Sequence, residues 1–128
     1  QTDISLLSVV VPFDIIDIKD ECVKNTVEQI ENKLRLENGG YMRYEGDNYI
    51  GGNAWIISSL WLALYYIKVG NMDKAHELFN WVTEHADNLN FLPEQINRNG
   101  HDSVWVMQLS WSHAMYVIVK NELLSKDK

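Results

Sequence analysis

The stretch from Asn53 to Val82, "NAWIISSLWLALYYIKVGNMDKAHELFNWV", decides the fold of this chain. Behind an expected N-cap at Asn53, the residues from Ala54 to about Val69 are apolar in nearly every direction, which predicts a helix that is buried on most sides. Gly70–Asn71 interrupts this helix, and a second helix is predicted from Met72 to about Leu89. Because a short turn makes two helices antiparallel neighbours, the stretch predicts a helical hairpin. The apolar face of the second helix contains Ala75, Leu78, Phe79 and Val82.

Two further helices are expected outside this hairpin. The first is capped within Asp17–Asp20 and runs to about Leu36, because apolar residues recur there at helical spacing. The last begins at Ser110–Ser112 and runs to Leu123. Leu6–Val11 is apolar and β-branched, so it is either a short strand or an extended arm. The expected fold is all-α, with antiparallel helices joined by loops that present polar residues.

Composition and charge limit the class of partner. Eleven basic residues against eighteen acidic ones give a net charge of -7 over 128 residues, which argues against nucleic acid and against an anionic membrane surface. The uncharged run Asn48–Ile67 begins with Gly and Asn residues and becomes apolar only at Ala54, so it is not expected to span a membrane. The single Cys22 excludes an internal disulfide. These features leave the compartment open, with the cytoplasm preferred.

One carboxylate stands out in the polar segment Asn90–Gly100, "NFLPEQINRNG". Glu94 directly follows Pro93, which stiffens the backbone, and Gln95 offers an amide beside it. Such a Glu can orient and deprotonate a water molecule as a general base, and we expect Gln95 among the substrate-binding residues. The alternative is a loop Glu without a catalytic task.

A second group of candidates lies in the aromatic loop before the central hairpin. Arg43 and Asp47 occur there with Tyr49, and an Arg fork can bind hydroxyl or carboxylate groups while a tyrosine stacks on a sugar ring. A structural Arg–Asp pair is the alternative. Trp55 and Trp111 stand near the starts of two predicted helices, so they either face one common site or pack in the core.

No metal site or cofactor is expected. The four His residues and the single Cys show no ligand spacing, and no glycine-rich loop for phosphate is present. His113 is expected to make a structural hydrogen bond.

Four motifs follow one another in the order "GGYMRYEGDNYIGGNAW", "WLALYYIKVGNMDKAHELFNWV", "LPEQ" and "LSWSHA". This order resembles the carboxy-terminal part of the glucoamylase-type enzymes, glycoside hydrolase family fifteen, which also includes glucodextranases and some trehalases. The resemblance implies a toroid of six helical hairpins and inverting hydrolysis of α-glucosidic bonds in starch-type or glycogen-type glucans. It implies that Glu94 is the general base. It assigns glucose binding to Arg43, Asp47, Tyr49, Trp55 and Trp111.

The resemblance also predicts what the chain lacks. No Trp precedes a Glu, as it would in the family's general-acid motif, so residues 1–128 are expected to be the carboxy-terminal portion of a larger catalytic domain and inactive alone. Helix faces that further hairpins would cover are expected to cause self-association. Two alternatives remain, a trehalase-type enzyme and a non-catalytic helical scaffold that binds protein or carbohydrate.

Overall fold

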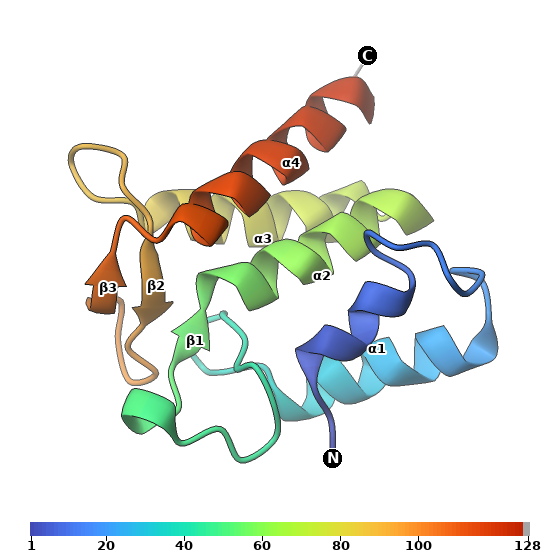
Figure 1. Ribbon diagram of the computed structural model, residues 1–128, viewed down its shortest axis with the longest axis horizontal. Coiled ribbons are helices and arrows are strands. Elements are labelled where there is room, and N and C mark those ends of the chain that lie inside the picture. The colour runs from blue at the N-terminus through green and yellow to red at the C-terminus, as the bar shows by residue number, and fades with distance from the viewer. Residues whose placement is uncertain (127–128) are drawn as a thin grey trace.

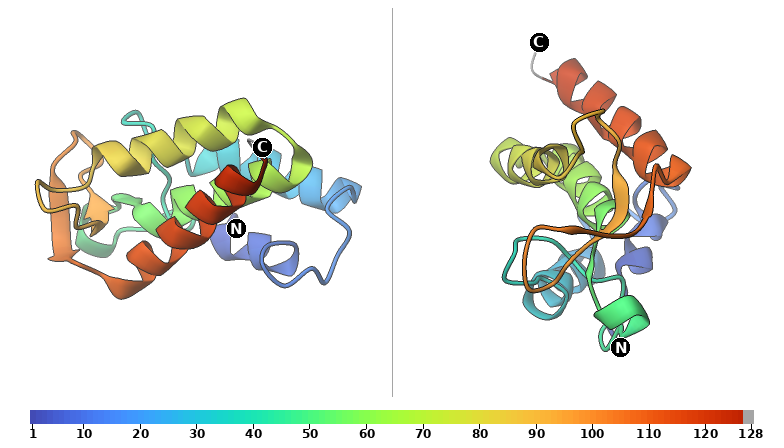
Figure 2. Two further views of the ribbon diagram at one scale, coloured as in Figure 1. Left: turned by 90° about the horizontal axis from the view of Figure 1, so that it is seen from above. Right: turned by 90° about the vertical axis from the view of Figure 1, so that its left-hand side faces the viewer.

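The predicted hairpin is the centre of the computed structural model, which describes residues 1–126. Helix α2 (Ile56–Val69) lies beside α3 (Met72–Glu84), and both views of the chain show the two helices packed along their length (Figures 1 and 2). Eleven of the fourteen residues of α2 are buried, which confirms the prediction of a helix covered on most sides. Gly70 ends α2 with φ 79°, in the left-handed region that glycine adopts without strain.

The flanking helices also follow the sequence. Helix α1 (Glu21–Lys33) begins behind Asp20, whose side chain accepts a hydrogen bond from the N–H of Cys22. Helix α4 (Ser110–Lys126) crosses over α2, as Figure 1 shows. The segment Leu6–Val11 is neither of the expected forms, because residues Ile4–Val9 form the 3-10 helix η1 that packs on α1 and α2.

The expectation of an all-α fold is wrong in one respect, because the mostly helical structure contains a small sheet. Its strands are β1 (Ala54–Trp55), β2 (Pro93–Ile96) and β3 (Ser103–Met107), antiparallel and in the order β1-β2-β3. Strand β1 is two residues long and pairs with a segment about forty residues away, so no local periodicity could indicate it. Glu94 therefore stands on a strand, not on a loop.

Two element boundaries differ from the prediction for reasons visible in the hydrogen bonds. Asn53 does not cap α2, because β1 intervenes and its side chain bonds elsewhere. Helix α3 stops at Glu84 instead of about Leu89. There the Asp87 carboxylate accepts hydrogen bonds from the N–H groups of Leu89 and Phe91, a turn that competes with helix continuation.

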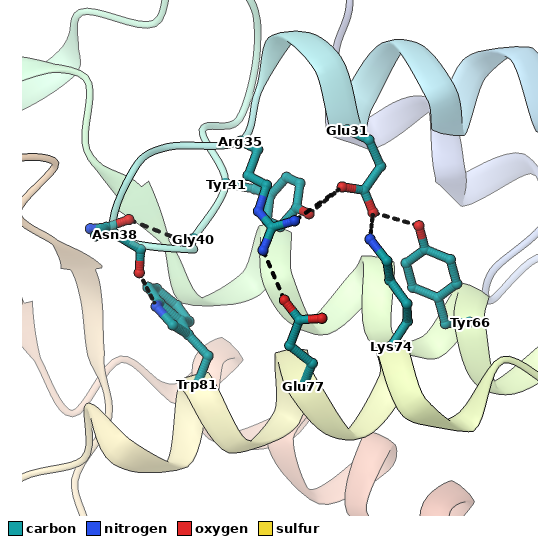
Figure 3. Close-up of polar contacts among 9 residues, drawn as sticks. All are labelled: Glu31, Arg35, Asn38, Gly40, Tyr41, Tyr66, Lys74, Glu77 and Trp81. Carbon is teal, nitrogen blue, oxygen red and sulfur yellow. Dashed lines mark hydrogen bonds and ion pairs between the residues drawn. The ribbon is translucent and has the colours of Figure 1, made fainter.

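A polar network ties α1 to the central hairpin (Figure 3). The Glu31 carboxylate of α1 accepts hydrogen bonds from the hydroxyls of Tyr41 and Tyr66 at 2.6 and 2.5 Å, and from Lys74 Nζ at 3.1 Å. Arg35 extends the network to Glu77 on α3 at 2.8 Å. Burial of the tyrosines and their bonds to the carboxylate raise the pKa of both Tyr hydroxyls, so they act as donors.

The loop after α1 is fixed against α3 by close packing. The indole of Trp81 donates a hydrogen bond to the carbonyl of Asn38 at 2.7 Å, and its ring covers Gly40 so closely that a Cβ there would lie 2.5 Å from it. Only glycine fits that position. The loop that follows leads directly into the candidate site. Within residues 1–126, no helix has the length and apolar character needed to cross a membrane.

Candidate active site

Arg43 and Asp47 form the anchored part of the site. Arg43 donates from Nε and one terminal nitrogen to the two carboxylate oxygens of the buried Asp47, at 2.9 and 3.1 Å. The N–H of Tyr49 donates to the same carboxylate at 3.1 Å. Burial alone would raise the pKa of Asp47, but the bonds from Arg43 and Tyr49 outweigh it and lower that pKa, so Asp47 is ionised. The paired charges fix the Arg43 fork in one orientation.

Three aromatic rings surround this guanidinium. Its carbon lies 4.0 Å from the ring centre of Trp55, 5.2 Å from that of Tyr49 and 5.3 Å from that of Tyr44. Within residues 1–126, the Nη1 group of Arg43 has no hydrogen-bond partner. The buried indole N–H of Trp55 has none in this part of the chain either. The cluster thus presents two unused donors.

Glu94 is placed beside this cluster by the sheet. Strand pairing sets Trp55 opposite Gln95, the residue after Glu94. The half-buried Glu94 carboxylate adds to the rise in the pKa of Arg43, whose main cause is the hydrogen bond to Asp47. The structure therefore brings together the expected base and the expected sugar-binding loop.

The carboxylate of Glu94 is oriented by two buried amides. Gln95 Nε2 donates to Glu94 Oε2 at 2.6 Å, and Gln95 Oε1 accepts from Asn53 Nδ2 at 3.2 Å. Asn53 is itself fixed, because it donates to the carbonyl of Ile50 at 2.8 Å and accepts from the N–H of Arg98 at 3.2 Å. Gln95 is fully buried, so its amide faces Glu94 instead of solvent. We call Asn53 and Gln95 the amide pair.

The first turn of α4 fixes the start of β2 and contributes Trp111. Ser112 Oγ donates to the carbonyl of Pro93 at 3.2 Å, and His113 Nε2 accepts from the N–H of Leu92 at 3.1 Å. The expected structural role of His113 is thereby confirmed. Trp111 is half-exposed and lines a cavity of about 300 Å³ that it shares with Arg43. The remaining lining residues are Asp3, Ile4, Ser5, Tyr44, Ile57 and Trp61.

Two residues at the site, Asn53 and Trp105, are not predicted from the sequence as site residues. Asn53 was expected only as a helix cap, although its Gly-Asn context could have indicated a buried turn. Trp105 of β3 lies with its ring centre 6.4 Å from that of Tyr49, in an edge-to-face arrangement. No spacing pattern marks it, since β3 was expected to be loop. Among residues 1–126, no group of three His, Cys, Asp or Glu side chains could hold a metal ion.

An ionised Arg–Asp pair within aromatic rings, next to an oriented carboxylate, can bind hydroxyl groups and deprotonate a water molecule. No family model matches the chain. An uncharacterized glycosyl hydrolase of Methanocaldococcus jannaschii is 38% identical over 91% of this chain and 21% of that protein. The isomaltose glucohydrolase of Kribbella flavida is 31% identical over 94% of this chain and 34% of its own length. Trehalase 1 of Sulfolobus acidocaldarius is 24% identical over 87% of this chain and 20% of its own length.

Solved structures give the same answer. A wild-type glycosidase superposes with a TM-score of 0.84 at 28% identity, over 94% of this chain and 35% of the other. A glycosidase variant in complex with glucose also gives 0.84, at 27% identity and the same coverage. The chain is therefore similar over nearly its whole length to glycoside hydrolases, which confirms the predicted resemblance. It spans about a fifth to a third of the length of the curated relatives it matches.

Proposed function

We propose that this chain is the base-bearing, carboxy-terminal portion of a glucoamylase-type catalytic domain that hydrolyses α-glucosidic bonds with inversion. Glu94 carries the proposal, because its carboxylate is held by Gln95 at 2.6 Å beside the Arg43 cluster. A general base must stand in one orientation relative to the water it deprotonates. The amide pair provides that orientation without using the second carboxylate oxygen.

In this reaction the water oxygen attacks the anomeric carbon while one water proton passes to Glu94. The glycosidic C–O bond breaks with its electron pair on the leaving oxygen, which takes a proton from a general acid. Inverting enzymes place the two carboxyl groups ~6.5–9.5 Å apart to admit the water. We assign the general acid to a part of the full catalytic domain outside residues 1–128, so the chain by itself is inactive.

The terminal glucose unit of the substrate is proposed to bind at Arg43 and Trp55. The unused Nη1 of Arg43 is a donor suited to sugar hydroxyls, and the ring of Trp55 supports the same guanidinium at 4.0 Å. Tyr49 and Trp111 supply aromatic surface for the ring, while Asp47 holds the Arg43 fork. No cofactor takes part.

The substrate is proposed to be an α-linked glucose oligosaccharide or a starch-type glucan. The names of the relatives support an α-glucoside in general, since one is an isomaltose glucohydrolase and two are trehalases. A trehalase-type activity is therefore the second candidate. Exposed apolar side chains on α4, among them Val117, Ile118 and Leu124, support self-association of the isolated chain.

The test compares Glu94→Gln with the wild type in the intact protein, by glucose release from maltotriose, isomaltose and trehalose. Gln keeps the hydrogen bond from Gln95 but cannot accept the water proton, so turnover falls about 10²–10⁴-fold. Glu84→Gln is the matched control, since Glu84 is exposed at the end of α3 and keeps full activity. Equal turnover by Glu94→Gln and wild type would place the base elsewhere. If neither protein cleaves any of the three sugars, the non-catalytic scaffold becomes the better interpretation.

A further inference from the structure

An irregularity in the β2–β3 pairing stands directly opposite Glu94. Pro93 pairs with Met107 and Gln95 pairs with Val104, so the single residue Glu94 faces two residues of β3. Those two residues are Trp105 and Val106. This is a β-bulge, a feature that redirects side chains and is common beside active sites.

Trp105 has an unusual backbone conformation within this bulge. Its φ is 69°, in the left-handed region that a bulky side chain rarely adopts. Gln108, directly after the same strand, also has a positive φ of 63°. The bulge therefore directs a large aromatic side chain in a way that an unstrained strand would not, which is a feature often found at ligand-binding positions.

The ring of Trp105 extends the aromatic cluster away from Arg43. Trp55 is 3% exposed, Tyr49 is 41% exposed and Trp105 is 58% exposed. The ring centres of Trp55 and Tyr49 lie 6.1 Å apart, and those of Tyr49 and Trp105 lie 6.4 Å apart. Strand β3 is also an edge strand of the sheet (Figure 1). The three rings are thus in successive contact, from the half-buried Arg43 guanidinium to the exposed ring of Trp105.

We propose that Trp105 is the stacking platform for the second sugar ring, on the leaving-group side of the bond that is cleaved. The inference rests on the proposed function, which places the terminal glucose at Arg43 and Trp55. A ring bound there leaves its glycosidic oxygen near Glu94, and Trp105 is the large exposed aromatic side chain across the strand from that carboxylate. Aromatic faces pack well against the apolar face of a pyranose ring.

The proposal predicts a difference between one sugar ring and two. Free glucose contacts only the inner cluster, so it leaves Trp105 unaffected. A disaccharide contacts both the inner cluster and the ring of Trp105. Removing the Trp105 ring should weaken disaccharide binding about threefold to tenfold, the effect expected for one aromatic stacking contact. Binding of glucose should stay unchanged, and Trp105→Phe should restore most of the disaccharide affinity.

The experiment follows the indole N–H resonances of Trp55 and Trp105 during titration with glucose, isomaltose and trehalose. It uses the intact protein with Glu94→Gln as the background for every variant, because that protein cleaves the disaccharides about 10²–10⁴-fold more slowly. The Trp105 resonance is assigned by its absence in Trp105→Phe. Glucose should shift only the Trp55 resonance, and the disaccharides should shift both. Trp105→Ala should lower disaccharide affinity as stated, whereas Val106→Ala, at the neighbouring bulge position, should not.

Each other outcome overturns the inference. If disaccharides shift Trp55 but not Trp105, and Trp105→Ala binds them normally, Trp105 is no subsite while the proposed function stands. If no sugar shifts either resonance, both proposals fail. If the Trp105 resonance responds to protein concentration instead of sugar, the ring belongs to a contact between protein molecules.

Discussion

Replacing Glu31 by Leu should remove a large part of the stability of this chain. The Glu31 side chain is 17% exposed and accepts three hydrogen bonds, two from tyrosine hydroxyls and one from Lys74 (Figure 3). Leu has similar volume but accepts none, so Tyr41, Tyr66 and Lys74 lose their shared partner. Breaking a buried ion pair costs about 3–5 kcal/mol. Because Lys74 is about one-third exposed and water can solvate it, we expect the lower end, about 3 kcal/mol.

Urea unfolding followed by circular dichroism measures this loss as a fall in the free energy of unfolding. Glu31→Gln should cost less than the Leu variant, because its amide oxygen still accepts one bond. Glu28→Gln is the matched control on the same helix, since Glu28 is exposed and should change stability by less than about 0.5 kcal/mol. A loss below about 1 kcal/mol for Glu31→Leu would refute the view that this network connects α1 to the hairpin.

The same network makes the stability of the fold depend on pH, in a direction that the pKa of Glu31 defines. Burial raises the pKa of Glu31, but the bonds from Tyr41, Tyr66 and Lys74 outweigh it, so that pKa lies below its ordinary value of 4.5. A carboxyl whose pKa is lowered on folding stabilises the fold above pH 4.5, and this contribution disappears as the pH falls through the lowered pKa. Wild-type stability should therefore fall more steeply below pH 4.5 than that of Glu31→Leu, and equal slopes would contradict the assignment.

Two further substitutions test the packing and the site. Gly40→Ala should lower the thermal midpoint and cost about 1–3 kcal/mol, because its Cβ would lie 2.5 Å from the Trp81 ring; an unchanged midpoint in a calorimetric scan would mean that the indole moves freely. In the intact protein, Asn53→Leu should lower kcat about tenfold to a hundredfold with little change in KM, because Gln95 loses its 3.2 Å partner and Glu94 its fixed orientation. A steady-state analysis that finds only KM altered would contradict this positioning role.

Local patterns in the sequence were sufficient to predict the helices but not the sheet. The stripe of Val23, Val27 and Ile30 predicts α1, and the apolar run before Gly70 predicts α2. Both signals depend only on residues that are close in the sequence. Strand β1 exists only through its pairing with β2, and that pairing depends on how the chain folds back. The 3-10 helix at Ile4–Val9 could not be predicted either, since the composition of this segment suits a strand.

In the candidate site too, contacts within one segment could be predicted from the sequence, whereas contacts between distant segments could not. Arg43 and Asp47 are four residues apart in one loop, so their pairing could be considered from the sequence alone. Asn53 and Gln95 are separated by 42 residues and meet only in the folded chain. Trp105 depends on a bulge in a strand pair that no periodicity predicted. The sequence indicated which residue types the site contains, whereas the roles of the supporting residues required the three-dimensional contacts.

The small sheet holds the carboxylate of Glu94 in one place, as its proposed role as a general base requires. On a free loop, Glu94 would sample many orientations. Instead β2 is fixed by pairing with β1 and β3, and by the hydrogen bond from Ser112 of α4 to the carbonyl of Pro93. Catalytic groups on strands are positioned more precisely than those on loops. The strand therefore fixes the backbone of Glu94 while Gln95 fixes its carboxylate. An arrangement this constrained is expected for a base that must meet water at one point.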